Sequence, residues 1–508
     1  MNKFDKILKI GGKIFSPETM VVTRQFTTIK GNRCVIYFSD GMVDKNSIND
    51  FVIRPISRGD FKISADVIAG SVIDFAEFKT SGNFFEFVSP VFGGEALLAI
   101  EGVDKYFSLN TRFWPTRGVS EPPTDMVIKG PREGFNEDFQ TCITLIKRRI
   151  KSPNLKFEAM KIGKYSQTNV ALCYVSRVAS KSLISAVRNK LENINIDGVI
   201  DSSYLKQFLK DSKFSVIRGV GDTEKPDILA SRLLEGRVAI IVDGSPIVLT
   251  LPYVFLEDLQ APQDYYDVPH SASFSRILRL ASMLVALFAP GVYVASQLFH
   301  NQFIPLSLLL KIAGESASLP LSPPLEMLVT LFIFEILNQA SLRMPKYVGM
   351  ALSVVGALVL GDTAVQAGLI STPTILIVAI SGIGAYTIPD QQSTISILRL
   401  AILLVGGVFG IVGIFCFAVA LAVYISGESS FGVSLLAPFS ARSNGDIDDG
   451  ILKMPSNPRK NRPKIFSSPN KTRVGETVGE SEKGDKEEKS ENKNDNKSEN
   501  KKQKSGGK

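Results

Sequence analysis

The stretch LASMLVALFAPGVYVASQL, Leu280–Leu298, decides the fold of this chain. It contains no charged residue and is long enough to cross the hydrocarbon core of a bilayer, which takes roughly 20 apolar residues in a helix. Two further segments pass the same test, Val348–Leu369 and Leu400–Ile425, the first interrupted only by the ionisable Asp362. Buried core helices of a large soluble domain explain one such segment but not three so close together, so hydropathy predicts a membrane block.

Composition divides the chain into three parts. On average the 508 residues are 44% apolar and 21% charged, but the part before about residue 270 is ordinary globular sequence and the end is polar. We therefore predict an α+β cytoplasmic domain made of two related subdomains, followed by a polytopic α-helical membrane domain. The predicted parts are an N-terminal segment (1–20), a first α+β subdomain (21–120), a second α+β subdomain with a linker helix (121–270), a helical membrane domain (271–440) and a disordered polar tail (441–508).

Charges beside the apolar block predict which side of the membrane each part occupies. The N-terminus, MNKFDKILKIGGKIF, lacks the apolar core and cleavage site of a signal peptide, so we expect no export of the first 270 residues. Arg276 and Arg279 precede the first span and a basic tail follows the last, which by the positive-inside bias makes both ends cytoplasmic. Two cytoplasmic ends require an even number of crossings.

An internal duplication organises the part before the block. Gly94–Leu109 aligns without gaps on Gly236–Leu251, and in both an apolar run meets an acidic residue plus glycine and then resumes. This pattern is typical of a two-residue β-hairpin, whose turn needs a positive φ that glycine supplies. The alternative is a chance similarity between two hairpins. Matching strand and helix segments lie upstream of each hairpin, at Cys34–Phe38 and Lys45–Ile56 in the first copy and at Val170–Val175 and Lys181–Ile194 in the second.

A linker helix is predicted between the two copies. It begins near Asn136, which can cap it, and it ends in the basic run Lys147–Lys151, which complements the helix dipole. This run, KRRIK, is the only dense basic run before the apolar block, and no groove with interleaved aromatic residues accompanies it. We interpret the run as a solvated helix face and expect no nucleic-acid partner.

Several of these segments together resemble a known family. They are GPREGFNEDFQTCITLIKRRIKSPNLKFEAMKIGKYSQTNVALCYV (130–175), NIDGVIDSSYL (195–205), LEGRVAIIVDGSPIVLTLPYVF (234–255), APQDYYD (261–267), ALVLGDTAVQAGLIS (357–371) and SFGVSLLAPFS (430–440). The chain resembles the A subunit of bacterial spore germinant receptors, the GerA family, over about residues 20 to 440. A sporulation membrane protein with the same domains fits nearly as well, and the sequence does not separate the two.

The resemblance implies a function. Its relatives act as one subunit of a nutrient-sensing complex in the inner spore membrane, with a transporter-like B subunit and a lipoprotein C subunit as partners. It also implies that the A subunit forms a homo-oligomer and conducts ions. The alternatives are a sporulation relative acting as a scaffold or channel accessory, and a secondary transporter, although no repeated membrane halves are found.

The apolar segments have to be arranged in the bilayer. We expect spans near 280–298, 325–342, 348–369 and 400–425, and a short re-entrant segment at 375–388 that glycines interrupt. In the alternative, 325–342 does not cross, which leaves Arg343 and Lys346 outside against the charge bias.

Polar residues within this block are the candidate functional residues. A carboxylate at mid-membrane costs ~2.5–3.5 kcal/mol on insertion scales, so Asp362 should face protein or water. The expected polar groups are Asp362, Thr363 and Gln366 on one helix, Glu335, Asn338 and Gln339 on another, and Asp390 at the end of an irregular stretch from Gly382. We expect the first two groups to meet in one aqueous cavity, with the lining of a ring in the Gly356–Asp390 region. A buried hydrogen-bonded carboxyl that joins two helices is the alternative for Asp362.

Glycines in the last span predict helix packing. Gly406, Gly410 and Gly413 fall on overlapping faces, and the Gly-x-x-x-Gly spacing lets helix backbones approach closely.

Motifs of covalent chemistry are missing. The sequence has no Walker motif, no G-x-S-x-G elbow and only two histidines, so we expect no enzyme activity, no cofactor and no metal site. The four cysteines follow no metal or redox spacing, which indicates a reducing compartment. The tail has almost no apolar residues and is expected to be disordered.

Overall fold

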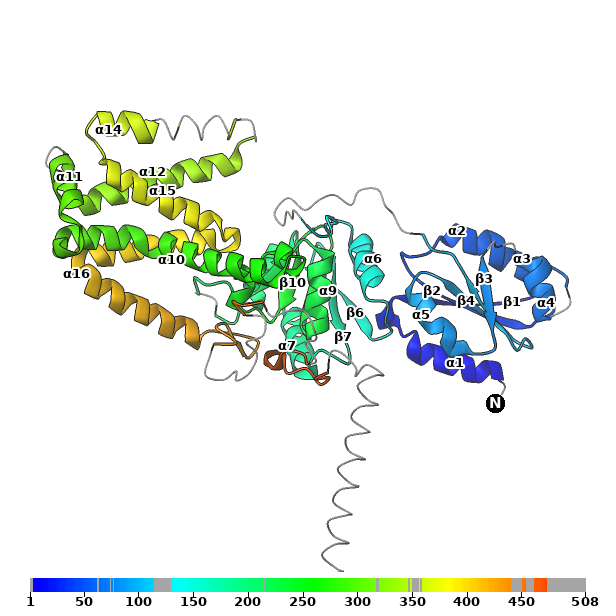
Figure 1. Ribbon diagram of the computed structural model, residues 1–508. Coiled ribbons are helices and arrows are strands. Elements are labelled where there is room, and N and C mark those ends of the chain that lie inside the picture. Colours follow the sequence, from blue (N-terminus) through cyan, green and yellow to red (C-terminus); the bar gives the residue numbers. More distant parts are fainter. Residues whose placement is uncertain are drawn as a thin grey trace, which may run out of the picture.

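Three parts follow one another along the molecule. Figure 1 shows a first α+β subdomain, a second α+β subdomain in the middle, and a helical block at the other end. The computed structural model describes residues 3–61, 64–73, 75, 77–113, 129–212, 215–316, 319–345, 348–349, 356, 359–439, 450–453 and 461–472.

The first subdomain is an antiparallel sheet with helices on both faces. Its strands are β1 (Val21–Thr27), β2 (Arg33–Ser39), β3 (Phe78–Ser81), β4 (Ala96–Ile100) and β5 (Tyr106–Leu109), in the order β1-β2-β4-β5-β3. The helices and helical turns are α1 (Lys3–Ile14), η1 (Pro17–Thr19), α2 (Lys45–Ile48), η2 (Asn49–Ile53), α3 (Arg54–Arg58), α4 (Ala65–Val67), η3 (Ile68–Val72), η4 (Phe84–Phe87) and α5 (Val88–Phe92). Every residue of β4 and β5 is buried, because α1 and α5 cover one face and α2 to η3 the other.

The second subdomain repeats this topology. Its strands are β6 (Leu155–Ile162), β7 (Thr168–Val175), β8 (Gly221–Thr223), β9 (Val238–Val242) and β10 (Val248–Leu251), in the order β6-β7-β9-β10-β8. The helices are α6 (Phe139–Arg149), α7 (Lys181–Glu192), α8 (Ser202–Leu209) and α9 (Pro226–Glu235), followed by the turns η5 (Phe255–Leu259) and η6 (Pro262–Tyr265). The strand order matches that of the first sheet position by position, as a duplicated α+β unit requires.

Two local predictions differ from the structure. The hairpin loops are longer than two residues: Glu101-Gly102 and Asp243-Gly244 form β-turns with positive φ at the glycines, but β5 and β10 resume only at Tyr106 and Val248. The linker helix is capped by Asp138 and not by Asn136, since the Asp138 carboxylate accepts a hydrogen bond from the Thr141 amide at 2.7 Å.

The basic run at the end of α6 is not a solvated face. The Lys147 side chain is only 3% exposed, and its ammonium donates to the Met20 carbonyl at 3.1 Å and to Ser39 Oγ at 3.0 Å in the first subdomain. Arg148 and Arg149 both pair with Glu133. Lys147 was predicted to be solvated because the sequence does not reveal that the first subdomain packs on this helix.

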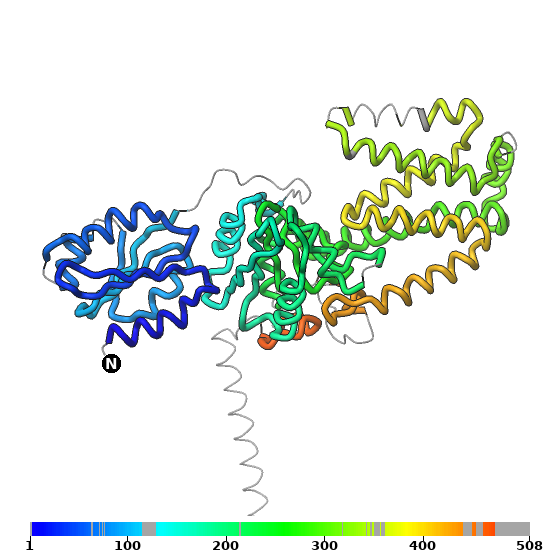
Figure 2. Tube along the Cα trace, turned by 180° about the vertical axis from the view of Figure 1, so that it is seen from behind, coloured from blue at the N-terminus to red at the C-terminus, as the bar shows by residue number. Residues whose placement is uncertain are grey.

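Long apolar helices form the block. They are α10 (Pro269–Phe299), α11 (Leu306–Ser316), α12 (Pro323–Arg343), α15 (Thr372–Tyr386) and α16 (Gln392–Gly427), with the short pieces η7 (Asn301–Phe303), η8 (Val359–Thr363), α14 (Ala364–Gln366) and η9 (Pro389–Gln391). Figure 2 shows the block from behind, with α10 and α16 extending away from the second subdomain. We call the end of the block at the second subdomain its near end and the opposite end, at Phe299, its far end.

Helix α16 starts and finishes at the near end. Gln391, just before the helix, donates to Tyr253 Oη at 3.1 Å in the second subdomain. Ser430, in the short strand β11 (Ser429–Ser430) that pairs with β12 (Val433–Ser434), donates to the Gly219 carbonyl at 2.8 Å. Both ends of the helix are therefore held by the same subdomain.

Gly410 allows this return. Its φ of +67° and ψ of −158° are not helical, and it lies beside Phe299 and His300 at the far end of α10. Only glycine adopts this backbone conformation without strain. Thus α16 consists of two legs that meet at Gly410, each about 26 Å long at 1.5 Å per residue.

The predicted spans are revised accordingly. Segment 400–425 was taken as one crossing, but it belongs to both legs of α16, because a single glycine reverses the chain. Segment 375–388 was expected to be re-entrant, yet α15 is a continuous helix that begins beside Glu326 at the start of α12 and ends against η5. Segment 325–342 forms α12, and much of segment 348–369 lies outside the described residues.

The block is apolar on its outside. Among the described helices, two are long and apolar enough to cross a membrane, Pro269–Phe299 and Pro389–Gly427. In their most apolar windows only 28% and 33% of the residues are buried, which differs from the core helices of a soluble domain. The leg after Gly410 exposes Val412, Phe415 and Val423 by 66–68%.

Part of the tail is ordered, contrary to the prediction of a disordered region from 441. Residues 461–472 pack on the second subdomain: Phe466 is 5% exposed and lies against the Arg237 guanidinium, and Arg462 donates to the Leu234 carbonyl at 2.8 Å. The prediction of disorder rested on the polar composition of the tail and overlooked two apolar side chains, Phe466 and Ile465, that pack in a hydrophobic cluster. The turn η10 (Lys464–Phe466) belongs to this piece.

The return of α16 predicts the sidedness of its ends. In a Cys416→Ala background, cysteines introduced at Ser393 and Ser426 should react with a membrane-impermeant thiol reagent from the same side, and a cysteine at Asn301 from the other. Labelling in intact and inverted vesicles measures this. If Ser393 and Ser426 label from opposite sides, α16 crosses once and the two-leg arrangement is wrong.

Candidate functional site

Arg218 joins the second subdomain to the start of α16. Its guanidinium pairs with Asp222 of β8, lies 3.2 Å from Asp258 Oδ1 in η5, and lies 3.2 Å from Asp390 Oδ2 in η9. Tyr253 Oη and Gln391 Nε2 both donate to Asp258 Oδ2 at 2.6 Å. One cation thus pairs with carboxylates from three elements. We call these residues, with Tyr253 and Gln391, the Arg218 cluster.

Burial controls the ionisation of the cluster. The Asp258 side chain is 3% exposed, and this loss of water raises the pKa of its carboxyl to about 6, against the opposing effect of Arg218. Burial also lowers the pKa of the Lys206 ammonium, which pairs with Asp222, to about 8. The carboxyl of Asp258 in the cluster and the amine of the adjacent Lys206 therefore titrate closer to neutrality than usual.

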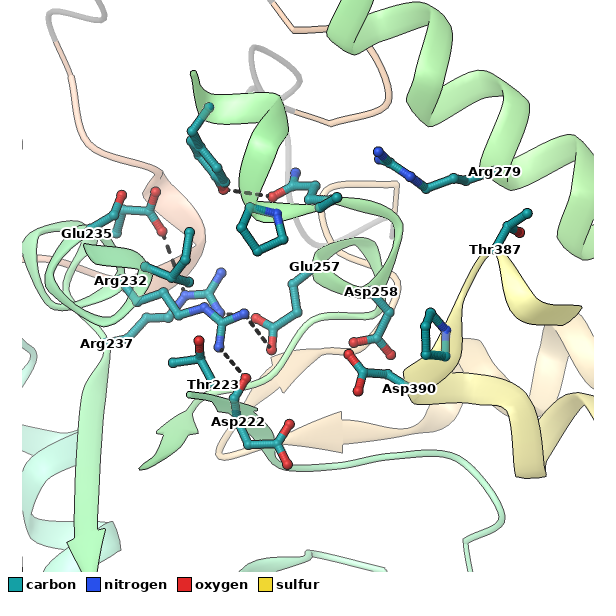
Figure 3. Close-up of a pocket in the computed structure, with 17 residues that line it drawn as sticks. Asp222, Thr223, Arg232, Glu235, Arg237, Glu257, Asp258, Arg279, Thr387 and Asp390 are labelled. Carbon is teal, nitrogen blue, oxygen red and sulfur yellow. Dashed lines mark hydrogen bonds and ion pairs between the residues drawn. The ribbon is translucent and has the colours of Figure 1, made fainter. Parts of the chain in front are cut away.

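A polar cavity lies beside the cluster. It measures about 400 Å³ and is lined by charged side chains from both parts of the protein (Figure 3). Its charged lining residues are Asp222, Arg232, Glu235, Arg237, Glu257, Asp258, Arg279 and Asp390. The arginines already hold internal partners: Arg237 pairs with Glu257, and Arg232 donates to the Asp222 carbonyl at 3.1 Å. The cavity therefore lies between the two parts, and these arginines are already paired within the chain.

Asp264 fastens the second subdomain to α10. This carboxylate is 1% exposed and accepts from Arg279 at 2.6 and 2.9 Å, with Arg276 Nε at 3.4 Å. Lys453, from the tail, donates to the Asp264 carbonyl at 2.6 Å. Arg276 and Arg279 were interpreted only as charges that orient the first span, but the structure shows that they also hold the subdomain.

A second ion pair lies inside the helical block. Arg399 of α16, whose side chain is 4% exposed, lies 3.4 Å from Glu335 Oε2 of α12 and donates to Ser381 Oγ of α15 at 3.0 Å. Ser396 also donates to Glu335 Oε2, at 3.1 Å. Three helices therefore meet at one charged pair.

The other predicted residues of α12 lie around this pair. Asn338 is 8% exposed and accepts from Tyr386 Oη of α15 at 3.0 Å. Gln339 donates to Glu335 Oε1 at 3.4 Å. Glu335 and Asn338 therefore face α15 and α16, whereas Gln339 is exposed and contacts Glu335 within α12.

Asp362, Thr363 and Gln366 lie elsewhere. All three are exposed, and Asp362 accepts a hydrogen bond from Gln366 at 3.0 Å. They belong to η8 and α14, which form an edge of the block in Figure 1. Among the hydrogen bonds and ion pairs of the described residues, none joins them to Glu335, so the expected common cavity of the two groups is not observed in a single chain.

The irregular stretch predicted from Gly382 to Asp390 is also largely helical in the structure. Asp390 lies at the near end of the block, in the Arg218 cluster. Gly382 packs on the Phe334 ring and Gly384 on the Ser282 carbonyl, so these glycines bring helices together instead of breaking α15. The sequence pattern of a broken segment and that of a tightly packed helix are the same.

The predicted packing glycines of α16 have different surroundings. A Cβ on Gly406 would lie 2.9 Å from the Gly291 carbonyl, so α16 approaches α10 closely there. Gly410 forms the break, and Gly413 contacts Phe409 and Val405 of its own helix. The shared face predicted from the spacing does not exist, because the helix is interrupted at Gly410.

Sequence reasoning missed the charges that hold the parts together. Arg218 and Asp258 carry no motif, and Arg399 directly precedes an apolar segment that was counted from Leu400. Glu326, near the start of α12, was not singled out, but its carboxylate accepts hydrogen bonds from the Ser371 amide and hydroxyl at 2.7 Å, at the start of α15. The only sequence signal for these residues was a single charge at the edge of an apolar run. Within the described residues, no three His, Cys, Asp or Glu side chains gather as a metal site.

The fold defines a class of protein in which a duplicated α+β domain is joined through buried ion pairs to an apolar helical block. Comparison with known proteins gives the family. The family model for the Bacillus/Clostridium GerA spore germination protein matches residues 10–465. The chain therefore belongs to the GerA family.

Individual relatives extend over most of the chain. Spore germination protein KA of Bacillus subtilis (strain 168) is 35% identical over 446 residues, which are 87% of this chain and 82% of that protein. Spore germination protein GerLA of Bacillus cereus is 29% identical and covers 93% of this chain and 97% of its own length. The membrane protein YfkQ of Bacillus subtilis (strain 168) is 32% identical, with 89% and 88% covered.

A solved structure is also similar. The N-terminal domain of the A subunit of the Bacillus megaterium spore germinant receptor GerK3 is 26% identical and has a TM-score of 0.40. It covers 50% of this chain and 96% of that chain.

Asp258 predicts a pH dependence of stability. Because its folded pKa, about 6, lies above the ordinary value near 3.9, the folded state binds the proton more tightly, and the free energy of unfolding falls as pH rises from 4 to 6. The fall is about 3 kcal/mol at most. Hydrogen exchange of β9 and β10 amides in the full chain measures it. Asp258→Asn should remove the fall, whereas Asp60→Asn, at an exposed carboxylate whose pKa is lowered by Lys30, should leave it.

The pair inside the block predicts a non-additive mutant cycle. Glu335→Gln leaves Arg399 as a buried charge without its carboxylate and should cost about 3 kcal/mol. The double variant with Arg399→Gln should lose less than this single variant, since no unpaired charge is left. Thermal unfolding in detergent measures the cycle. Additive losses would show that the two side chains do not interact.

Proposed function

We propose that this chain is the membrane subunit of a nutrient-sensing spore germination receptor. In this proposal the helical block crosses the inner spore membrane, several copies form a ring, and the ring conducts cations when a partner subunit binds a germinant. The α+β domain and the tail lie on the cytoplasmic side. Membership in the GerA family supports the receptor role, because several relatives are spore germination proteins.

The surface of the helical block supports a membrane location. Apolar side chains such as Phe409, Val412 and Phe415 are 66–69% exposed. Contact between such a surface and water is unfavourable, whereas contact with lipid is not. The start of α10 and the segment after α16 both contact the second subdomain, which supports an even number of passes with the domain and the tail on one side. Arg276 and Arg279 at the near end agree with a cytoplasmic position for that side.

The exposed polar group on η8 and α14 carries the proposal of a ring. Asp362, Thr363 and Gln366 are exposed at an edge of the block. A carboxylate there would be costly against lipid, so it requires water or a neighbouring protein surface. A ring of subunits supplies both, because its inner wall is formed by such edges. The Glu335–Arg399 pair would then fix the helices behind this wall.

Partners follow from the same arrangement. A B subunit of transporter type would bind the nutrient, and a lipoprotein C subunit would complete the complex. The Arg218 cluster supports coupling between the cytoplasmic domain and the ring, since it attaches directly to the start of α16. No chemical step by this chain is needed.

The ring predicts a specific effect of the exposed group. Spores carrying Asp362→Asn together with Thr363→Phe should release K⁺ several-fold more slowly after nutrient addition, because the variant removes the charge and narrows the lining. A potassium electrode measures the release. Val412→Leu, at an exposed apolar residue, is the control and should release K⁺ normally.

A second measurement tests the ring itself. Cysteine at Gln366 should form cross-linked dimers with a short bifunctional reagent in spore membranes, whereas cysteine at Val412 should not. Unchanged release and absent cross-links, at normal protein level, would contradict the ring and favour a scaffold role.

A further inference from the structure

The contact between the two α+β subdomains is mainly polar. Helix α6 lies on the side of the second subdomain that faces the first (Figure 1), and Gln140, Thr144 and Lys147 of this helix lie against the loop after β2. Thr144 Oγ1 donates to the Gly41 carbonyl at 3.3 Å. Among the described residues, Met20 is the only side chain of the first subdomain that packs against the hydrophobic core of the second. Polar contacts of this kind are typical of domains that can move relative to one another.

Lys147 places an ammonium inside this contact. Its side chain is 3% exposed, and Nζ donates to Ser39 Oγ at 3.0 Å, to the Met20 carbonyl at 3.1 Å and to the Asp40 carbonyl at 3.5 Å. All three acceptors are neutral and belong to the first subdomain. The ammonium therefore loses water when the subdomains come together, and it gains hydrogen bonds without a bound carboxylate in return.

The charged groups around Lys147 do not compensate its charge. On the elements packed against it, these groups are Asp40 after β2, Glu18 in η1, Lys156 on β6, and Arg148 and Arg149 on α6 itself. Each has another partner: Asp40 pairs with Lys45 at 2.7 Å, Glu18 lies 3.8 Å from Lys156, and the two arginines pair with Glu133. The Phe157 ring of β6, 5.9 Å from Nζ, carries no charge. Burial lowers the pKa of Lys147 from 10.5 to about 7, against a smaller opposing effect of Asp40.

This burial makes the contact sensitive to pH. When the subdomains separate, Nζ regains water, so the separated state binds the proton more tightly than the closed state does. Protonation therefore favours separation, and the contact becomes stronger as pH rises through 7 towards 10. With the pKa of Lys147 near 7 in the closed state, the ratio of closed to separated molecules should rise about tenfold between pH 6 and pH 8. Well below pH 7 both states carry the proton, and no further change follows.

We propose that the contact between the two subdomains is a proton-controlled hinge, in which a charged Lys147 favours separation and a neutral Lys147 favours closure. The second subdomain is fastened to the helical block by Asp264 and by the Arg218 cluster. The first subdomain is therefore the part that moves. The hinge goes beyond the proposed receptor function and does not depend on it.

Opening is measured by the reactivity of a cysteine inside the contact. Thr144 is 1% exposed, so Thr144→Cys, in a Cys416→Ala background, reacts with a thiol reagent when the subdomains separate. The other three natural cysteines are buried. Ser185→Cys, at an exposed position of α7, gives the reference rate at each pH and corrects for ionisation of the thiol. In the full chain in lipid nanodiscs, the ratio of the two rates should fall about tenfold between pH 6 and pH 8.

Two lysines of the same contact allow a matched comparison. Lys147→Met keeps the length of the side chain without the amine, so the rate ratio should be low and should change by less than about twofold over this range. Lys156 donates to Ser16 Oγ at 2.7 Å and lies near Glu18, and Lys156→Met should keep the tenfold change.

Two further variants test the hinge independently. Asp40→Asn removes the carboxylate that favours the protonated amine, so the fall of the rate ratio should begin at a lower pH than in the parent. This variant keeps the test valid if Lys147→Met does not fold. A Cβ on Gly41 would lie 2.6 Å from Thr144 Oγ1, so Gly41→Ala should raise the rate ratio at every pH and confirm that the cysteine reports on the contact.

Several results would overturn the hinge. A rate ratio that stays constant in the parent from pH 6 to pH 8 is one, and a fall that persists in Lys147→Met is another. A higher ratio at every pH in Lys147→Met would show that the amine only supplies structural hydrogen bonds. Loss of the pH dependence in Lys156→Met would assign it to a different residue. Ion release plays no part in these measurements, so they are separate from the test of the ring.

Discussion

Pairing of buried charges at the near end of the helical block is the constraint on which this structure depends. Asp264 and the Arg218 cluster lie where a polar α+β domain meets apolar helices, and Asp264 and Asp258 are almost fully shielded from water. An unpaired charge in such a place costs several kcal/mol, so the positions of α10 and α16 are fixed by their partners in η5 and η6. The two parts of the chain therefore form one connected body at this junction.

Reversal at Gly410 follows from the same constraint. Gln391 and Ser430 both bind the second subdomain, and the chain between them is too long to remain at the near end as one straight helix. The chain therefore runs to the far end and back, and a single residue with a positive φ, Gly410, makes the turn. Close approach of α16 to α10 at Gly406 and Gly291 then supports the first leg along its length.

Periodicity and hydropathy predicted much of the fold because they report local burial. The repeated hairpin, the strand at Cys34–Phe38 and the apolar segments around 280–298 and 400–425 all correspond to elements of the structure. The points at which the chain reverses were harder to predict. A glycine that interrupts a helix and a glycine that lets two helices pack closely cannot be told apart in an apolar sequence. Gly410 and Gly384 illustrate the two cases.

Partners of charged side chains could not be derived from the sequence either. Lys147 was interpreted as solvated and Arg276 as a topology signal, yet both are buried and hydrogen-bonded to groups far away in the chain. Long-range pairing of this kind depends on how whole subdomains pack. By contrast, the polar residues of α12 were recognised because a carboxylate and two amides in an apolar run conflict with burial unless they have partners.

One helix connects the junction with the interior of the block. Asp390 precedes the first leg of α16 and pairs with Arg218, while Arg399 lies further along the same leg and pairs with Glu335. The two pairs are separated by about 14 Å of helix, at 1.5 Å per residue. A helix of this length moves as a rigid rod, so a shift of η9 against the second subdomain would be carried to Arg399. Glu335 would then have to move with Arg399, since a buried charge left without its partner costs several kcal/mol. The α+β domain and the polar interior of the block are coupled by this geometry.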